Sequence, residues 1–149
     1  MDADEFKTFL LCYTREINEN TNIAFNPIIE RFGLTMLQVR ILLEIHQNGS
    51  HTIGSLANRI KMAGTNISTM CKKLEKREFL ERVRNPEDER VVLVILTEKG
   101  SEIVSYIDQV IIEKLSEESA QTLNDIMIGL QKLNKLLQKF GENEKSSFE

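Results

Sequence analysis

Two β-prone segments flank a charged loop in a chain that otherwise shows helical periodicity. The segment 91–96 reads Val-Val-Leu-Val-Ile-Leu, and the segment 79–84 precedes it across the loop 85–90, Asn-Pro-Glu-Asp-Glu-Arg. Runs rich in β-branched residues favour strands, and two such runs joined by a polar turn form a hairpin. We therefore expect a fold class that is mainly α with a small β-hairpin wing.

The chain ahead of the hairpin has the apolar spacing of helices. A long helix is expected over residues 4–32, with a kink at Pro27 because proline removes a backbone donor. Thr35 is a good N-cap and Gln38 stands three residues later, so this capping box begins a second helix. Asn48-Gly49 ends that helix, and residues 51–53 can pair as a short strand.

Two further helices are expected on either side of a tight turn at residues 61–64. The first begins at Gly54-Ser55, and the second covers residues 65–78. The second helix has one apolar stripe that we expect to be buried, with spacings of three, one and three residues, formed by Ile67, Met70, Cys71 and Leu74. Its opposite face is polar and carries Thr65, Asn66, Ser68, Thr69, Lys72, Lys73 and Lys76.

Two long helices are expected after the hairpin. Thr97 caps the first, and the second begins at Ser116 and ends at Phe140. The polar tail at residues 141–149 is expected to be frayed. The length of 149 residues suits one domain, and the hydrophobic fraction of 41% is enough to form a core.

The charge of the chain is unevenly distributed. The net charge of −4 by itself argues against a nucleic-acid partner. Residues 59–90, however, contain nine basic and six acidic side chains, a net charge of +3, and the rest of the chain carries −7. A basic segment on an acidic chain provides a local surface for phosphate groups. The simpler interpretation is a solvated helix face, so the charge needs support from a motif.

The sequence argues against several classes of protein. The acidic N-terminus is not a signal peptide, and no run approaches the ~20 apolar residues of a membrane span, so we expect a cytoplasmic protein with no membrane partner. Cys12 and Cys71 make no disulfide framework, and with His46 and His51 they match no zinc spacing. We expect no metal and no other cofactor. The sequence shows neither a catalytic triad nor a glycine-rich phosphate loop, so we do not expect an enzyme.

The order of helix, tight turn, polar-faced helix and charged hairpin is the layout of a winged helix-turn-helix. A major groove admits one helix with slim hydrogen-bonding side chains, which the start of the 65–78 helix provides. The lysines further along that helix can meet phosphates. Arg84 and Arg90 flank a hairpin tip that can reach a minor groove. The sequence therefore predicts binding to double-stranded DNA.

Five short motifs resemble the multiple antibiotic resistance regulator (MarR) family of bacterial transcription regulators. In order, they are Leu34-Thr35-x-x-Gln38, Leu56-Ala57-x-x-Ile60, Leu74-Glu75-Lys76, the run from Arg82 to Arg90, and Leu96-Thr97-x-x-Gly100. The resemblance implies a homodimer held by dimerisation helices at residues 1–33 and 97–140. It also implies a DNA-binding lobe at residues 34–96, with each lobe reading half of a pseudo-palindromic operator.

The resemblance implies roles for single residues as well. By the family pattern Arg90 enters the minor groove, and Asp88 holds Arg90 in place by an ion pair. A pocket for a small-molecule effector is implied between the dimerisation helices and the DNA-binding lobe. The chain departs from the family at Glu78, where a glycine is usual. Because a left-handed cap costs more without glycine, we expect the 65–78 helix to end differently.

Alternatives stay open at several positions. Thr65 and Asn66 can cap a helix as well as contact bases. Cys71 is expected to be a core residue, whereas Cys12 in the first helix is a candidate redox sensor. His46 and His51 are candidate metal ligands. We expect a transcription regulator, a repressor under small-molecule or oxidant control, and the alternative is a winged-helix protein–protein interaction module without DNA binding.

Overall fold

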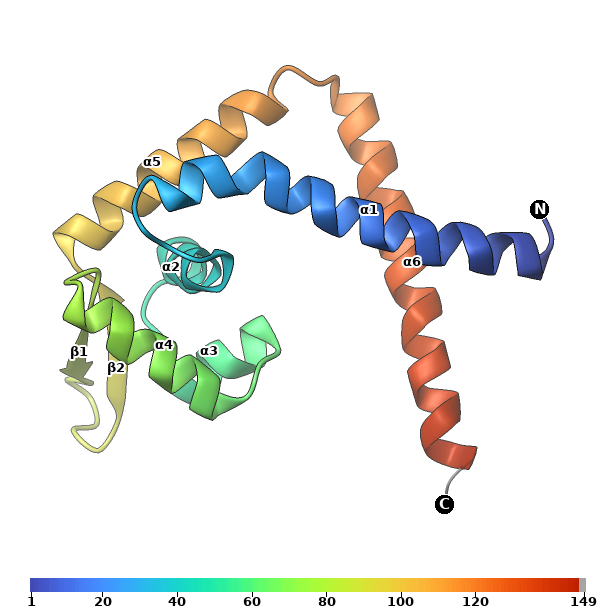
Figure 1. The fold of residues 1–149 in the computed structure, drawn as a ribbon. Helices are drawn as coiled ribbons and strands as arrows, with labels where there is room; N and C mark the ends of the chain where they lie inside the picture. The colour runs from blue at the N-terminus through green and yellow to red at the C-terminus, as the bar shows by residue number, and fades with distance from the viewer. Residues whose placement is uncertain (148–149) are drawn as a thin grey trace. The chain divides into compact units, whose positions relative to one another are not determined.

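The computed structural model describes residues 1–147, with side chains described up to residue 142. The described elements, shown in Figure 1, are in order α1 (Ala3–Glu30), α2 (Met36–Asn48), α3 (Ile53–Ile60), α4 (Gly64–Lys76), β1 (Leu80–Arg84), β2 (Val92–Leu96), α5 (Glu98–Leu115) and α6 (Ala120–Ser147). This mainly helical fold with one hairpin confirms the predicted fold class. The chain divides into two compact units, Met1–Gln109 and Val110–Glu149, and the division falls inside α5.

The two longest helices bury very little within their own units. Asp2 caps α1 through a capping box with Glu5, and Pro27 lies inside this helix. Ile29 is the one residue of α1 that is buried, and α6 has no buried residue among those described. Large apolar side chains are therefore exposed on α1, including Phe9, Leu11, Tyr13, Ile17 and Ile23.

The core of the first unit lies among α2, α3, α4, the hairpin and the first part of α5. Thr35 and Gln38 form the predicted capping box of α2, and Gly49 ends this helix with a φ of 81°. The fully buried large side chains include Ile41, Leu42, Leu56, Ile67, Leu74, Phe79, Leu80, Val94 and Ile107. The apolar positions that define the predicted periodicity of residues 34–96 are therefore largely the buried ones.

The short strand expected at residues 51–53 does not form. Only His51 pairs with a strand, through an isolated bridge in which its N–H donates to the Val94 carbonyl at 3.2 Å and its carbonyl accepts from the Val94 N–H at 2.7 Å. Thr52 is instead the N-cap of α3, since its Oγ1 accepts from the Ser55 N–H at 3.1 Å. Ile53 is already helical because this cap begins the helix one residue before Gly54.

The end of α4 corrects the expectation drawn from Glu78. Glu78 adopts the left-handed conformation, with a φ of 64°, in the place where a glycine would stand. The Phe79 N–H donates to the Leu74 carbonyl at 3.0 Å, and the Glu78 N–H donates to the Glu75 carbonyl at 2.9 Å. These two bonds form a Schellman motif, so the helix ends as it would with glycine.

The hairpin is joined directly to α5. The strands pair antiparallel from Leu80 opposite Leu96 to Arg84 opposite Val92. Thr97 caps α5 as predicted, because its Oγ1 accepts from the Gly100 N–H at 3.0 Å. A Cβ on Gly100 would lie 2.0 Å from the Phe79 carbonyl oxygen, so only glycine allows α5 to approach the start of the hairpin this closely.

The last helix begins and ends later than predicted. The Ser116 hydroxyl donates back to the Ile112 carbonyl at 2.7 Å, and Ser119 accepts from the Thr122 N–H at 3.0 Å. Ser119 therefore takes the capping position that we assigned to Ser116. The helix continues to Ser147 rather than ending at Phe140. Of the tail expected at 141–149, residues 148 and 149 lie outside the described residues.

Candidate nucleic-acid interface

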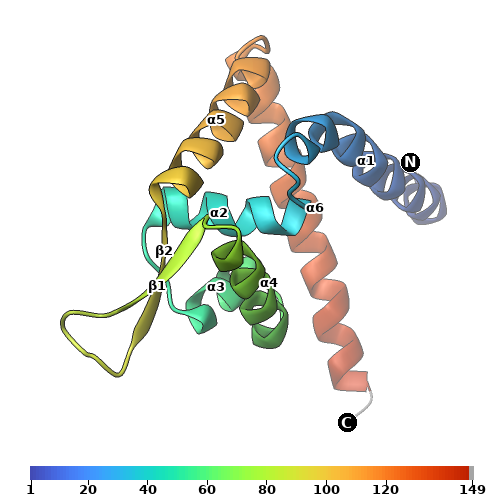
Figure 2. The same ribbon diagram turned by 60° about the vertical axis from the view of Figure 1, so that its left-hand side comes forward.

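The turn between α3 and α4 is tight because one residue is left-handed. Lys61 follows α3 with a φ of 58°, and the Met62 N–H donates to the Ala57 carbonyl at 3.0 Å. The chain turns over Lys61–Ala63, and Gly64 is the first residue of α4. Buried Leu56, Ile60 and Ile67 help to hold the two helices together. Figure 2 shows the resulting pair beside the hairpin.

One face of α4 is buried and the other is mostly open. Ile67, Cys71 and Leu74 are buried as predicted, and Met70 is half-buried. Of the predicted contact residues, those that are exposed are Thr65, Asn66, Thr69, Lys72, Lys73 and Lys76. Ser68 is half-buried, and the Thr69 hydroxyl donates to the Thr65 carbonyl at 2.9 Å. The open face therefore has three lysines, two of them in the last turn.

The N-terminus of α4 has no side-chain cap. Its N-cap is Ala63, and no side chain accepts a hydrogen bond there. Neither Thr65 nor Asn66 is a capping residue, so the alternative role that we left open for both is wrong. Backbone donors in the first turn of an uncapped helix are available to an anion such as a phosphate.

The hairpin loop is held by side chains within the wing. The Arg90 side chain is 91% exposed, and its Nε lies 3.1 Å from Asp88 Oδ1. Asp88 Oδ1 also accepts from the Arg90 N–H at 3.1 Å. These bonds from Arg90 hold the pKa of the Asp88 carboxyl below its usual value. The ion pair that the resemblance implied is therefore present, and it orients an exposed guanidinium at the loop.

Arg84 has an internal partner that the sequence did not indicate. Its Nη1 donates to the Glu89 carbonyl at 2.7 Å, across the base of the loop. Arg82 on β1 lies 3.2 Å from Glu75 on α4, measured from Nε to Oε2. Arg84 therefore stabilises the loop by a hydrogen bond across it, and Arg82 joins the hairpin to α4 by an ion pair. The Arg82–Glu75 pair joins two elements, so its proximity depends on the tertiary fold, whereas Arg84 and Glu89 stand five residues apart within the hairpin.

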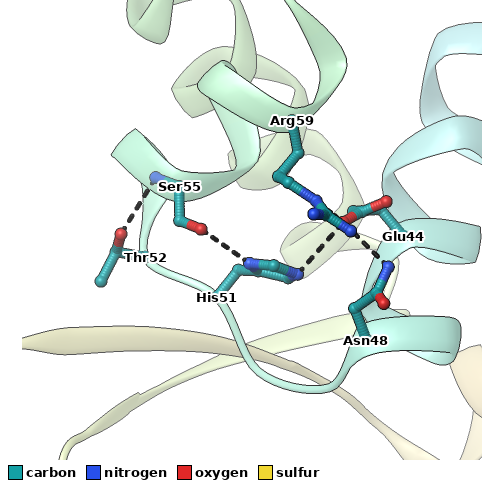
Figure 3. A network of polar contacts seen from close by, with 6 residues as sticks. All are labelled: Glu44, Asn48, His51, Thr52, Ser55 and Arg59. Atoms are coloured by element: carbon teal, nitrogen blue, oxygen red, sulfur yellow. Dashed lines mark hydrogen bonds and ion pairs between the residues drawn. The ribbon is translucent and has the colours of Figure 1, made fainter.

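A polar network joins α2 to α3 (Figure 3). Glu44 accepts from Arg59 Nε at 2.7 Å and from Asn48 Nδ2 at 3.0 Å, and the nearest His51 ring nitrogen, Nε2, is 3.4 Å away. His51 Nδ1 lies 2.9 Å from the Ser55 hydroxyl. The hydrogen bond from Arg59 is the main cause that lowers the pKa of the Glu44 carboxyl. The network therefore links α2 to both the first and the last turn of α3.

The structure places His51, Cys71 and Cys12 in different surroundings. His51 Nδ1 lies beside the Ser55 hydroxyl, its Nε2 lies 3.4 Å from Glu44 Oε1 without a hydrogen bond, and no group of three or more His, Cys, Asp or Glu residues gathers within the described part of the chain. Cys71 is 1% exposed, and burial raises the pKa of its thiol to about 11, so it is a core residue. Cys12 is exposed on α1, with its Sγ 3.5 Å from Glu16 Oε1.

A helix-turn-helix with a polar-faced second helix beside a charged hairpin defines a winged helix-turn-helix protein. The family model for the SarA/Rot transcriptional regulators matches residues 24–107, and the chain belongs to this family. Its relatives and fold neighbours are transcription regulators rather than enzymes. No helix among the described residues is both long enough and apolar enough to span a membrane.

Curated relatives agree with the family assignment. An uncharacterized HTH-type transcriptional regulator of Bacillus subtilis, YhbI, is 31% identical over 91 residues, which cover 61% of this chain and 59% of YhbI. The SarZ regulator of Staphylococcus epidermidis is 26% identical over 118 residues, covering 76% of this chain and 80% of SarZ. The chain is thus a winged-helix transcription regulator.

Solved structures with the same fold include MarR proteins. A MarR family protein from Bacillus stearothermophilus aligns with a TM-score of 0.68 at 22% identity, covering 93% of this chain and 99% of that one. A cysteine-to-serine mutant of MarR from E. coli, in complex with operator DNA, aligns with a TM-score of 0.73 at 22% identity, covering 89% and 99%. At this identity the likeness establishes the fold, which confirms the MarR-like architecture.

Proposed function

We propose that this protein is a homodimeric repressor that binds pseudo-palindromic operators in double-stranded DNA. The observation that carries the proposal is the open polar face of α4 beside a hairpin that presents Arg90. A helix of this kind fits a major groove, and an adjacent arginine fits a minor groove. The MarR structure in complex with operator DNA supports the same use of this fold.

Each predicted residue has a role in the proposal. Thr65, Asn66, Ser68 and Thr69 read bases from the first two turns of α4, with Ser68 at the edge of the open face. The three lysines of α4, Lys72, Lys73 and Lys76, contact phosphates, as do the uncapped backbone donors at its start. Arg90 enters the minor groove, oriented by Asp88, while Arg84 braces the loop from which Arg90 projects.

The exposed apolar side chains support a second copy of this chain as a partner. Ile23 is 71% exposed and Leu11 is 68% exposed on α1, and α6 exposes Ile126, Leu130 and Phe140. Soluble monomers rarely leave apolar surface of this extent uncovered, and a symmetric dimer is the commonest solution. We assign dimerisation to residues 1–33 and 97–140. Control by a small molecule, or by an oxidant at Cys12, stays a prediction.

Selection of bound sequences from a random duplex library tests the proposal. An enriched inverted repeat with half-sites about one helical turn apart is the expected result for a dimer of winged lobes. The affinity for the enriched sequence should fall steeply with salt, since each phosphate contact releases counterions. A well-folded dimer that enriches no sequence and binds DNA weakly would contradict the proposal and favour the protein–protein interaction module.

Arg90→Ala tests the wing directly. We expect operator affinity to fall about tenfold or more, because the variant loses a charged minor-groove contact. Fluorescence anisotropy with the enriched duplex measures the change, and the oligomeric state should be unaltered. Arg40→Ala is the matched control, because Arg40 is an exposed arginine on α2 outside the interface. Equal affinities for Arg90→Ala and the wild type would remove Arg90 from the interface.

A further inference from the structure

Arg77 joins the end of the proposed recognition helix to the end of α1. It is the C-cap residue of α4. Its Nη1 donates to the Gly33 carbonyl at 2.6 Å, and its Nη2 donates to the Phe32 carbonyl at 2.6 Å. Both carbonyls belong to the turn that follows α1, more than 40 residues earlier in the chain. One side chain therefore spans two elements that are far apart in sequence.

The turn after α1 needs a donor from elsewhere in the fold. The Phe32 and Gly33 carbonyls lie just beyond α1, near the negative end of its dipole, which favours a positive charge. The last turn of α1 contains no basic residue. Gly33 is left-handed, with a φ of 63°, and a Cβ there would lie 3.2 Å from Arg77 Nη2. The guanidinium thus fits closely against this turn and adds to the positive charge of Arg31, the C-cap residue of α1.

Arg77 also contacts the start of α5. Its carbonyl accepts from Lys99 Nζ at 3.1 Å. The Arg77 guanidinium carbon is 4.8 Å from the centre of the Phe79 ring, and Lys99 Nζ is 4.9 Å from the same centre. Phe79 itself is buried. Contacts of this kind with an aromatic ring stabilise a cation. The ends of α1 and α4 and the beginning of α5 therefore meet at Arg77.

We propose that Arg77 is a positioning residue for DNA binding, which fixes the orientation of α4 relative to α1 and α5. The proposal rests on the proposed function, because it assigns to Arg77 the placement of the helix that reads the operator. Arg77 does not contact DNA in this role, since its guanidinium is half-buried and is taken up by two carbonyls. Recognition of bases requires a fixed helix, whereas attraction to phosphates tolerates a misplaced one.

The comparison of Arg77→Met with Arg77→Lys tests this role. The methionine variant keeps much of the side-chain volume and loses every N–H donor, while the lysine variant keeps the charge and one donor group. We expect Arg77→Met to remain a folded dimer and to bind the enriched operator about tenfold more weakly, with a much smaller change for random duplex. Arg77→Lys should recover part of the loss. Arg40→Met, which removes an exposed arginine charge, should change neither affinity.

Two results would overturn the proposal. An equal loss of affinity for operator and random duplex, with a salt slope reduced by about one, would make Arg77 a phosphate contact. A lower melting temperature with unchanged operator affinity of the folded protein would make Arg77 a merely stabilising residue. If the wild type enriches no operator, the proposed function fails instead, so the two failures are distinguishable.

A second variant covers the case in which Arg77→Met does not fold. Gly33→Ala places a methyl group against the guanidinium from the α1 side and leaves Arg77 intact. We expect it to reduce the ratio of operator affinity to random-duplex affinity as well. Alanine at a positive φ is strained whichever residue stands at position 77. The effect of Gly33→Ala in the Arg77→Lys variant therefore measures how much of the change comes from this strain. An unchanged ratio in Gly33→Ala would also overturn the proposal.

Discussion

At the scale of single residues, Glu78 holds a conformation that its side chain disfavours. The Schellman motif at the end of α4 requires a residue with positive φ, and Glu78 supplies it at 64°. A hydrogen bond stabilises this conformation, since the Thr97 hydroxyl donates to the Glu78 carbonyl at 2.5 Å. A residue with a Cβ is strained in the left-handed region, so the backbone strain at Glu78 lowers the free energy of unfolding.

Glu78→Gly should therefore raise the free energy of unfolding by about 1 kcal/mol, because glycine adopts positive φ without strain. Urea denaturation followed by circular dichroism measures the change. Glu78→Ala is the matched control, since it removes the same carboxylate and keeps the Cβ. If the alanine variant is stabilised as much as the glycine variant, the gain comes from the lost charge and the strain argument is wrong.

Residues that act on their neighbours in sequence were predictable, and residues that act across the fold were not. Thr35, Gln38 and Thr97 cap the helices that we assigned to them, since a cap depends on a few adjacent positions. Arg77 and Arg82 were missed, because their partners stand in other elements. Thr69 stays a predicted contact residue, and its hydroxyl, which donates to its own helix, can still accept a hydrogen bond.

At the scale of elements, the joint between α2 and α3 depends on an ionised carboxylate. Glu44 has 17% of its side chain exposed and accepts hydrogen bonds from Arg59 and Asn48. Its pKa is lowered from an ordinary value of 4.5, with Arg59 as the main cause. A carboxyl with a lowered pKa in the folded state stabilises the fold above its ordinary pKa. That stabilisation is lost as the pH falls through the folded-state value.

Glu44→Gln should lower the free energy of unfolding by about 1 kcal/mol at pH 7, because the amide cannot pair with Arg59 as a charge. The difference from the wild type should shrink as the pH falls below 4.5, where the carboxyl of the unfolded chain becomes protonated, and should vanish below the lowered folded-state pKa. Denaturant titrations between pH 7 and about pH 3 measure both effects. Glu102→Gln, at an exposed site on α5, is the control. A difference that stays constant with pH would refute the role of the charge.

The helix-turn-helix and the hairpin followed from periodicity, whereas two element boundaries depended on competing caps. Ile67, Cys71 and Leu74 of the α4 stripe are buried as their spacing predicts, and Met70 is half-buried. The segment 51–53 has strand-like residues, but the Thr52 side chain satisfies a backbone donor of α3 and so begins a helix there. Similarly, Ser119 caps α6 because Ser116 bonds back to the preceding turn.

At the scale of the whole molecule, assembly should depend on the exposed apolar side chains of α1. We expect the wild type to have twice the chain mass of 17.2 kDa in light scattering at about 50 µM. Ile23→Glu should shift the mass toward one chain, because it buries a carboxylate in the interface at a cost of roughly 2 kcal/mol or more. On a free surface the same substitution would cost little.

Val92→Glu is the control for this experiment. Val92 is also an exposed apolar residue, at 40%, and it stands on β2 outside the segments that we assign to dimerisation. Its substitution should leave the mass of the assembly unchanged. A wild-type protein with the mass of a single chain at this concentration would contradict the proposed dimer. A dimer that tolerates Ile23→Glu would move the interface away from this part of α1.

The single residue between β2 and α5 restricts how the length of this chain can vary. Thr97 alone separates Leu96 from Glu98, and its hydroxyl contacts both Glu78 and Gly100. One inserted residue here would turn α5 by ~100° and move Gly100 away from Phe79. The exposed loop 85–90 can grow at a small cost in loop-closure entropy. Insertions and deletions among relatives should therefore accumulate at the tip of the hairpin, while the spacing at its base is kept.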